Sequence, residues 1–214
     1  MGPTPIRTAF LLTALLAVVL LELAAAYLGT RWQIPRIDLI AIARMAQTLA
    51  LLTLTLVQAG SLRVFGLDKA SILPGLKKGM AWSAGFAAAA ALLFIGLYMA
   101  GQDPLALVRS ALPEGAKQQV HFFLVAGIVG PVFEEILFRG IIFGFLRRWN
   151  VTAAVLVSTA VFAAFHLPGI PVTQIVGGIV FAVAYHTGKS LMVPIVIHVL
   201  GNLAIFSLSL PLFH

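Results

Sequence analysis

Seven long apolar stretches restrict the fold of this chain more than any other feature of its sequence. They lie at residues 8–29, 37–60, 80–101, 120–146, 151–167, 172–187 and 190–210. A helix needs about 20 apolar residues to cross the hydrocarbon core of a bilayer. The pattern therefore predicts an all-α fold, a polytopic transmembrane helical bundle of about seven spans that forms a single membrane domain over residues 1–214.

The composition favours a lipid environment. Hydrophobic residues make up 61% of the 214 residues and charged residues only 10%, whereas a soluble domain carries about 25% charged residues. A soluble fold would leave much of this apolar surface in water, which a bilayer solvates instead. The chain contains no cysteine, so thiol nucleophiles and disulfide bonds are excluded.

Two connections between the apolar stretches are long enough to have structure of their own. Residues 61–79 mix large apolar residues with Arg63, Lys69 and Lys77, a pattern typical of an amphipathic segment at the membrane interface. Residues 102–119 show a weaker form of the same pattern. We therefore expect one or two interfacial amphipathic segments beside the spans.

The basic residues predict the orientation of the chain. With the N-terminus inside, eight Lys and Arg residues fall in the inner loops and four in the outer loops, and cytoplasmic loops are enriched in these residues. We expect a multi-pass protein of the cytoplasmic membrane of a prokaryote, with its N-terminus inside. The net charge of +7 arises largely from these loops and indicates contacts with the lipid bilayer, with no nucleic acid as partner.

Two acidic residues lie side by side within an apolar stretch. Glu134 and Glu135 are two of only seven acidic residues in the chain, and an ionised side chain near mid-membrane costs about 2.5 to 3.5 kcal/mol on insertion scales. Arg139 follows Glu135 by four residues, so the two lie on one helix face and can form an ion pair. Glu134 is rotated by about 100° from Glu135 on a helix and needs another polar neighbour.

Two later apolar stretches offer polar side chains at helical spacing. Phe162 and His166 are four residues apart, as are His198 and Asn202, which places both members of each pair on one helix face. We expect Glu134, His166 and His198 to meet at a similar depth in a polar cavity. Taken singly, each of these polar residues is equally well explained by a hydrogen bond or ion pair between helices.

Other polar residues have a structural interpretation. Glu22 and Arg44, in the first two apolar stretches, are expected to pair with each other between helices. Three further histidines fall near predicted helix ends, where an imidazole meets headgroups or water, and we assign them no role. They are His121, His186 and His214.

Three spaced motifs occur together in the order of a known family. They read Glu134-Glu135-x-x-x-Arg139, Phe162-x-x-x-His166 and His198-x-x-x-Asn202. In this order the set resembles the CAAX protease and bacteriocin-processing family, also called the type II CAAX prenyl endopeptidase or Abi family. The motifs fall within residues 120–210, which would be the catalytic core, whereas residues 1–119 carry no recognised motif.

The resemblance implies a glutamic-type intramembrane protease that hydrolyses a peptide bond in a membrane-associated peptide or protein terminus and uses no cofactor. It implies that Glu134 and His166 activate a water molecule. It also implies that His198 and Asn202 stabilise the oxyanion. Supporting roles fall on Glu135, Arg139 and Phe162.

The chemistry is reasonable without the family name, and it leaves alternatives. A glutamate can act as the base for water, and His and Asn side chains can donate to a tetrahedral oxyanion. Glu134, His166 and His198 are also a sufficient ligand set for catalytic zinc in a metal-dependent version of the same hydrolase. A non-catalytic immunity or binding protein, or a small transporter with a proton relay, is the remaining alternative.

Overall fold

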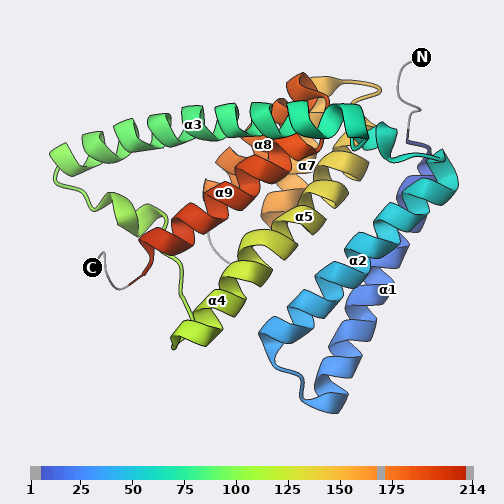
Figure 1. Ribbon diagram of the computed structural model, residues 1–214, viewed down its shortest axis with the longest axis horizontal. Coiled ribbons are helices and arrows are strands. Elements are labelled where there is room, and N and C mark those ends of the chain that lie inside the picture. The colour runs from blue at the N-terminus through green and yellow to red at the C-terminus, as the bar shows by residue number, and fades with distance from the viewer. Residues whose placement is uncertain (1–5, 168–171, 211–214) are drawn as a thin grey trace.

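The computed structural model describes residues 6–167 and 172–210. Within these ranges all regular structure is helical (Figure 1), which confirms the predicted all-α class. The first part of the chain forms α1 (Thr8–Trp32), α2 (Arg36–Ala59) and α3 (Lys69–Met99), with short 3-10 turns at η1 (Leu62–Phe65) and η2 (Pro104–Leu107). The last part forms α7 (Val151–Ala164), α8 (Val172–Gly188) and α9 (Met192–Leu208).

One continuous helix, residues 116–146, lies between these two parts of the chain. Its hydrogen bonding alternates between α and π geometry. In order, its segments are α4 (Ala116–Leu124), the π-helical η3 (Val125–Val129), α5 (Gly130–Glu134), the π-helical η4 (Glu135–Phe143) and α6 (Gly144–Leu146). Because π-helical turns are rare and are often found at functional sites, this helix is the first place to look for one.

Four helices in the described part of the chain are long and apolar enough to cross a membrane. They cover residues 8–32, 36–59, 62–99 and 116–146. The helices α7, α8 and α9 are apolar but shorter, with 14, 17 and 17 residues. Each of the seven predicted stretches corresponds to one of these helices, so the predicted membrane bundle is confirmed.

The segment at residues 61–79 differs from the prediction of a separate interfacial element. α3 already begins at Lys69, so residues 69–79 continue directly into the predicted span. The start is fixed by Asp68, whose side chain accepts a hydrogen bond from the backbone N–H of Ala70 at 3.0 Å and thus caps the helix. Residues 102–119 contain η2 and the first turn of α4.

The helix over residues 116–146 lies at the centre of the arrangement. α1 and α2 form an antiparallel hairpin on one side of it, and α2 packs against α5 (Figure 1). On the other side α9 packs against α5 and α3, while α8 packs against α7 and α9. The buried core includes Phe133, Phe138 and Phe143 of the central helix, so polar groups on this helix are enclosed on several sides.

Candidate active site

The Glu135–Arg139 pair forms the buried centre of the motif region. Nη1 of Arg139 donates to Oε1 of Glu135 at 3.0 Å, and both side chains are 0% exposed. Nη2 of Arg139 also donates to the backbone carbonyl of Gly178 in α8 at 3.3 Å. The predicted ion pair is therefore confirmed, and its guanidinium connects the central helix to α8.

Three phenylalanine rings surround the Arg139 guanidinium. Its Cζ atom lies 4.6 Å from the ring centroid of Phe162, 5.1 Å from that of Phe181 and 6.0 Å from that of Phe138. Aromatic faces attract a cation most strongly where water is excluded. The rings belong to α7, α8 and η4, so the contacts fix the relative positions of all three elements around the charged pair.

His198 of α9 contacts both glutamates and is buried. Its Nδ1 lies 2.7 Å from Oε1 of Glu135, and its Nε2 lies 3.7 Å from Oε2 of Glu134. Because Glu135 is paired with Arg139, it acts as an acceptor, so Nδ1 of His198 carries the donated proton. The imidazole also stacks on Phe181, with ring centroids 4.6 Å apart. His198 is thus the polar neighbour that Glu134 was expected to need.

The two adjacent glutamates lie in different environments. Glu135 is fully enclosed, whereas the side chain of Glu134 is 21% exposed. Glu134 ends α5, and Glu135 begins the following π segment. Glu134 is therefore the glutamate that water or a substrate can reach.

His166 lies just beyond the end of α7, and its side chain is exposed. Its Nδ1 is 2.9 Å from the backbone carbonyl of Phe162. Because a carbonyl can only accept, Nδ1 carries the proton, and Nε2 is the acceptor in the neutral ring. The Phe162 ring lies 4.8 Å from that of His166 and 5.9 Å from that of His198. Within the described residues no hydrogen bond joins His166 to Glu134, so their shared water stays a prediction.

Asn202 lies one turn after His198 on α9. Its Nδ2 donates to the backbone carbonyl of Ala126 at 3.0 Å, and Ala126 belongs to the first π segment. An amide nitrogen carries two hydrogens. The contact with Ala126 therefore fixes the orientation of the amide and uses one of its two N–H groups. The second N–H group can donate to another acceptor.

A metal ion would need a third ligand close to Glu134 and His198. Among the residues 6–167 and 172–210, no three His, Asp or Glu side chains are grouped so that they could hold one. His166, the third member of the predicted zinc set, contacts Phe162 instead. The metal-dependent version of the hydrolase stays a prediction, which activity measurements with a chelator test.

The sequence interpretation did not single out Phe181, Gly178 or Ala126. Phe181 is an aromatic residue in an apolar helix, which carries no distinctive signal. For Gly178 the reason is visible only in the structure, where an added Cβ would lie 2.7 Å from Cγ2 of Thr159 and a glycine permits this close approach of α7 and α8. The Ala126 carbonyl contributes through its backbone, which a sequence motif does not show.

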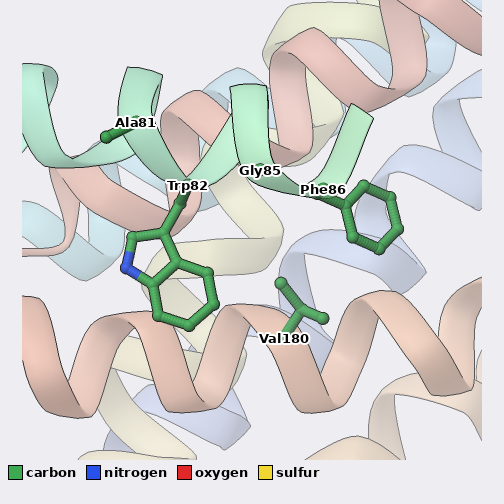
Figure 2. Close-up of a pocket in the computed structure, with 5 residues that line it drawn as sticks. All are labelled: Ala81, Trp82, Gly85, Phe86 and Val180. Atoms are coloured by element: carbon green, nitrogen blue, oxygen red, sulfur yellow. The ribbon is translucent and has the colours of Figure 1, made fainter. Parts of the chain in front are cut away.

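An apolar cavity of about 480 Å³, wide open to the surface, lies between α3 and α8 (Figure 2). It is lined by Ala81, Trp82, Gly85, Phe86 and Val180. Val180 directly precedes Phe181, whose ring stacks on His198. The cavity therefore borders the helix that forms one wall of the charged cluster.

Comparison with known proteins supports the motif assignment. Residues 116–204 match the family described as type II CAAX prenyl endopeptidase Rce1-like. This range contains every residue of the three motifs, so the family resemblance seen in the sequence is confirmed.

Two bacterial proteins are similar to part of the chain. The chain is 39% identical over 90 residues to the membrane-embedded CAAX protease MroQ of Staphylococcus aureus (strain USA300), which covers 38% of this chain and 36% of that protein. It is 38% identical over 81 residues to a protein of Bacillus subtilis (strain 168) described as the membrane peptidase YdiL, which covers 37% of this chain and 33% of that protein. The chain thus spans about a third of the length of the curated relatives it matches. No solved structure matches the chain.

Proposed function

We propose that this chain, whose residues 116–204 match the type II CAAX prenyl endopeptidase Rce1-like family, hydrolyses a peptide bond in a membrane-associated peptide or protein terminus. The observation that carries the proposal is the double contact of His198, through Nδ1 with Glu135 at 2.7 Å and through Nε2 with Glu134 at 3.7 Å. A buried carboxylate that orients an imidazole beside a second, accessible carboxylate is suited to acid–base catalysis.

The oxyanion role proposed for His198 requires a donor on Nε2. Because Nδ1 donates to Glu135, only the imidazolium form of His198 carries a second proton on Nε2. The imidazolium then keeps its Nδ1–H on Glu135 and presents Nε2–H toward the side of Glu134. A hydrogen-bond donor that is already oriented before the reaction stabilises a tetrahedral intermediate most effectively. Asn202 supplies the second donor through its remaining amide hydrogen.

Glu134 is the base for water in this proposal. Water gives its proton to Glu134, and its oxygen attacks the carbonyl carbon of the scissile bond. The C–N bond then breaks, and Glu134 returns the proton to the departing amine, so the carboxylate is regenerated. His166 holds the water through its unprotonated Nε2. Glu135 is unsuited to this role because Arg139 and His198 already share its Oε1 atom.

The substrate is expected to have an apolar segment next to the cleaved bond. The cavity between α3 and α8 is walled by apolar and aromatic groups and borders the helix that carries Phe181. In this proposal an apolar segment of the substrate packs against these groups, and the bond to be cleaved extends past α8 toward the charged cluster. The excess of basic residues in the predicted inner loops supports an N-terminus on the cytoplasmic side.

The test is cleavage of a lipid-anchored fluorogenic peptide with apolar terminal residues by the purified chain in lipid nanodiscs. Glu134→Gln removes the base at almost constant volume and should lower the rate by about 10²- to 10⁴-fold. Glu114→Gln, in the exposed connection before α4, is the matched control and should retain activity. A chelator should leave the wild-type rate unchanged.

Each other result has a defined meaning. Cleavage by Glu134→Gln at the wild-type rate removes the base assignment. Loss of activity with chelator and recovery with zinc establishes the metal-dependent version. If the wild-type chain cleaves no peptide in a broad membrane-anchored set, the non-catalytic alternative replaces the protease.

A further inference from the structure

A second polar cluster lies between α1 and α2, outside the residues that match the family. Nη1 of Arg44 donates to Oε2 of Glu22 at 2.8 Å and to Oε1 of Gln47 at 2.5 Å. The buried Gln47 donates from Nε2 to the same Glu22 oxygen at 2.9 Å and to the Val18 carbonyl at 3.2 Å. Ionised and amide groups are costly inside a bilayer and are usually kept there for a function. The cluster holds Arg44 in one orientation.

The fixed guanidinium of Arg44 points at the central helix. Its Cζ atom lies 4.8 Å from the ring centroid of Phe133. Phe133 is buried and directly precedes Glu134. The contact is a cation–π interaction, which is strong where both partners are shielded from water. It is a direct link between the N-terminal hairpin and the residue next to the proposed base.

The central helix needs such an external contact at this position. α5 has only five residues, Gly130–Glu134, and a π-helical segment adjoins it at each end. π-Helical turns occur mostly as single insertions into α-helices, and here the hydrogen-bond pattern changes on both sides of the segment that carries Glu134. The direction in which Glu134 points therefore depends on the packing of neighbouring helices as well as on local hydrogen bonds.

We propose that Arg44 is a positioning residue for Glu134 and acts through Phe133. Successive side chains on an α-helix diverge by about 100°, so residues 133, 134 and 135 point to three sides. Phe133 is held by Arg44 on one side, and Glu135 is held by Arg139 and His198 on another. Holding both neighbours fixes Glu134 between them. The inference rests on the proposed role of Glu134 as base.

A double-mutant cycle on the cleavage reaction tests this coupling. Arg44→Met removes the cation, and Phe133→Leu removes the aromatic face while it keeps an apolar side chain. Each should lower kcat by about tenfold to a hundredfold with KM within about twofold, because misplacement of a catalytic group affects the chemical step. The kcat of the double variant should be no lower than that of the less active single variant, since both substitutions remove the same contact.

Two further variants separate positioning from general helix packing. Arg44→Lys keeps the charge and should recover part of kcat. Thr55→Val alters a buried α2 residue whose hydroxyl bonds to the Leu51 carbonyl of its own helix at 2.6 Å, and it should leave kcat unchanged. If Arg44→Met and Phe133→Leu lower kcat by independent factors that multiply, the two residues do not act together and the proposal is wrong.

A readout without cleavage distinguishes this proposal from the proposed function. Dicyclohexylcarbodiimide reacts with carboxyl groups in membranes, and mass spectrometry of the labelled chain gives the rate at Glu134. Arg44→Met and Phe133→Leu should each change that rate severalfold, whereas Thr55→Val should not. An unchanged rate in both variants overturns the positioning role even if the enzyme is active. A changed rate in a chain that cleaves nothing supports the positioning and rejects the protease.

Discussion

The N-terminal helices and the central helix differ in how much of their surface is buried within the protein. In α1, α2 and the helix over residues 62–99, 17%, 22% and 0% of the most apolar stretch is buried within the protein, whereas the value is 44% for the helix over residues 116–146. Lipid therefore covers most of the first three helices, and other helices cover much of the fourth. Apolar length brings a helix into the membrane, and enclosure by several helices allows the central one to hold a fully buried ion pair.

The ion pairs in the two regions show the same difference. Glu135 and Arg139 are both 0% exposed, and His198 and the Gly178 carbonyl make further contacts with the pair. Glu22 and Arg44 are 54% and 25% exposed. Further hydrogen bonds hold both pairs, but only the first pair is fully enclosed by protein. This suggests that the first pair supports the site and that the second adjusts it from outside.

The largest expected effect compares these two pairs directly. Arg139→Met should lower the free energy of unfolding by about 3–5 kcal/mol, because it leaves the Glu135 carboxylate buried without its cation. Glu22→Gln should lower it by less, because the amide oxygen of glutamine can still accept hydrogen bonds from Arg44 and Gln47. Denaturation of both variants in the same lipid or detergent measures the two values.

The double variant Glu135→Gln/Arg139→Met serves as the control. With both charges removed, much of the lost stability should return, since no buried charge is left unpaired. Equal destabilisation by Arg139→Met and Glu22→Gln would remove the distinction between an enclosed and an open ion pair.

The sequence predicted the membrane bundle and the pairings that depend on spacing along one helix. Glu135 and Arg139 pair as the i, i+4 rule required, at 3.0 Å. The predicted pairing of Glu22 with Arg44 between two helices is also found, at 2.8 Å. Few charged residues occur in these spans, so each had few possible partners, and the high cost of an unpaired charge made the assignment specific.

Contacts that depend on backbone geometry could not be predicted from the sequence. The contact of His198 with Glu135 requires α9 to cross the central helix at one particular height. The Ala126 carbonyl accepts from Asn202 within a π segment, which no sequence pattern predicted. The early start of α3 was the exception, because Asp68 is a recognisable N-cap residue and could have indicated it.

A second prediction compares single hydrogen-bond donors in the two regions. Asn202 bonds across helices to Ala126, whereas Thr13 in α1 bonds to the Ala9 carbonyl of its own helix at 2.8 Å. Asn202→Ala should lower kcat by about a hundredfold or more, the usual cost of losing one oxyanion donor. Thr13→Val should leave kcat unchanged. Asn202→Ala with full kcat in the peptide assay would reject the donor role.

The smallest expected effect is that of a substitution in α3, which tests whether the N-terminal region contributes to substrate binding. Gly85 of α3 lines the apolar cavity (Figure 2), and a Cβ added there meets nothing within 4 Å. Gly85→Leu should therefore fill the cavity without disturbing the fold. If the cavity holds an apolar part of the substrate, KM should rise by about fivefold with kcat nearly constant, because binding is weakened and the chemistry is not.

Gly96 provides the matched control on the same helix. A Cβ added at Gly96 also meets nothing within 4 Å, but Gly96 does not line the cavity. Gly96→Leu therefore introduces the same side chain into α3 and should leave KM unchanged. An equal KM for both leucine variants would mean that α3 only anchors the protein. A rise confined to Gly85→Leu would mean that a lipid-exposed helix also selects the substrate, so that the two regions divide binding and chemistry between them.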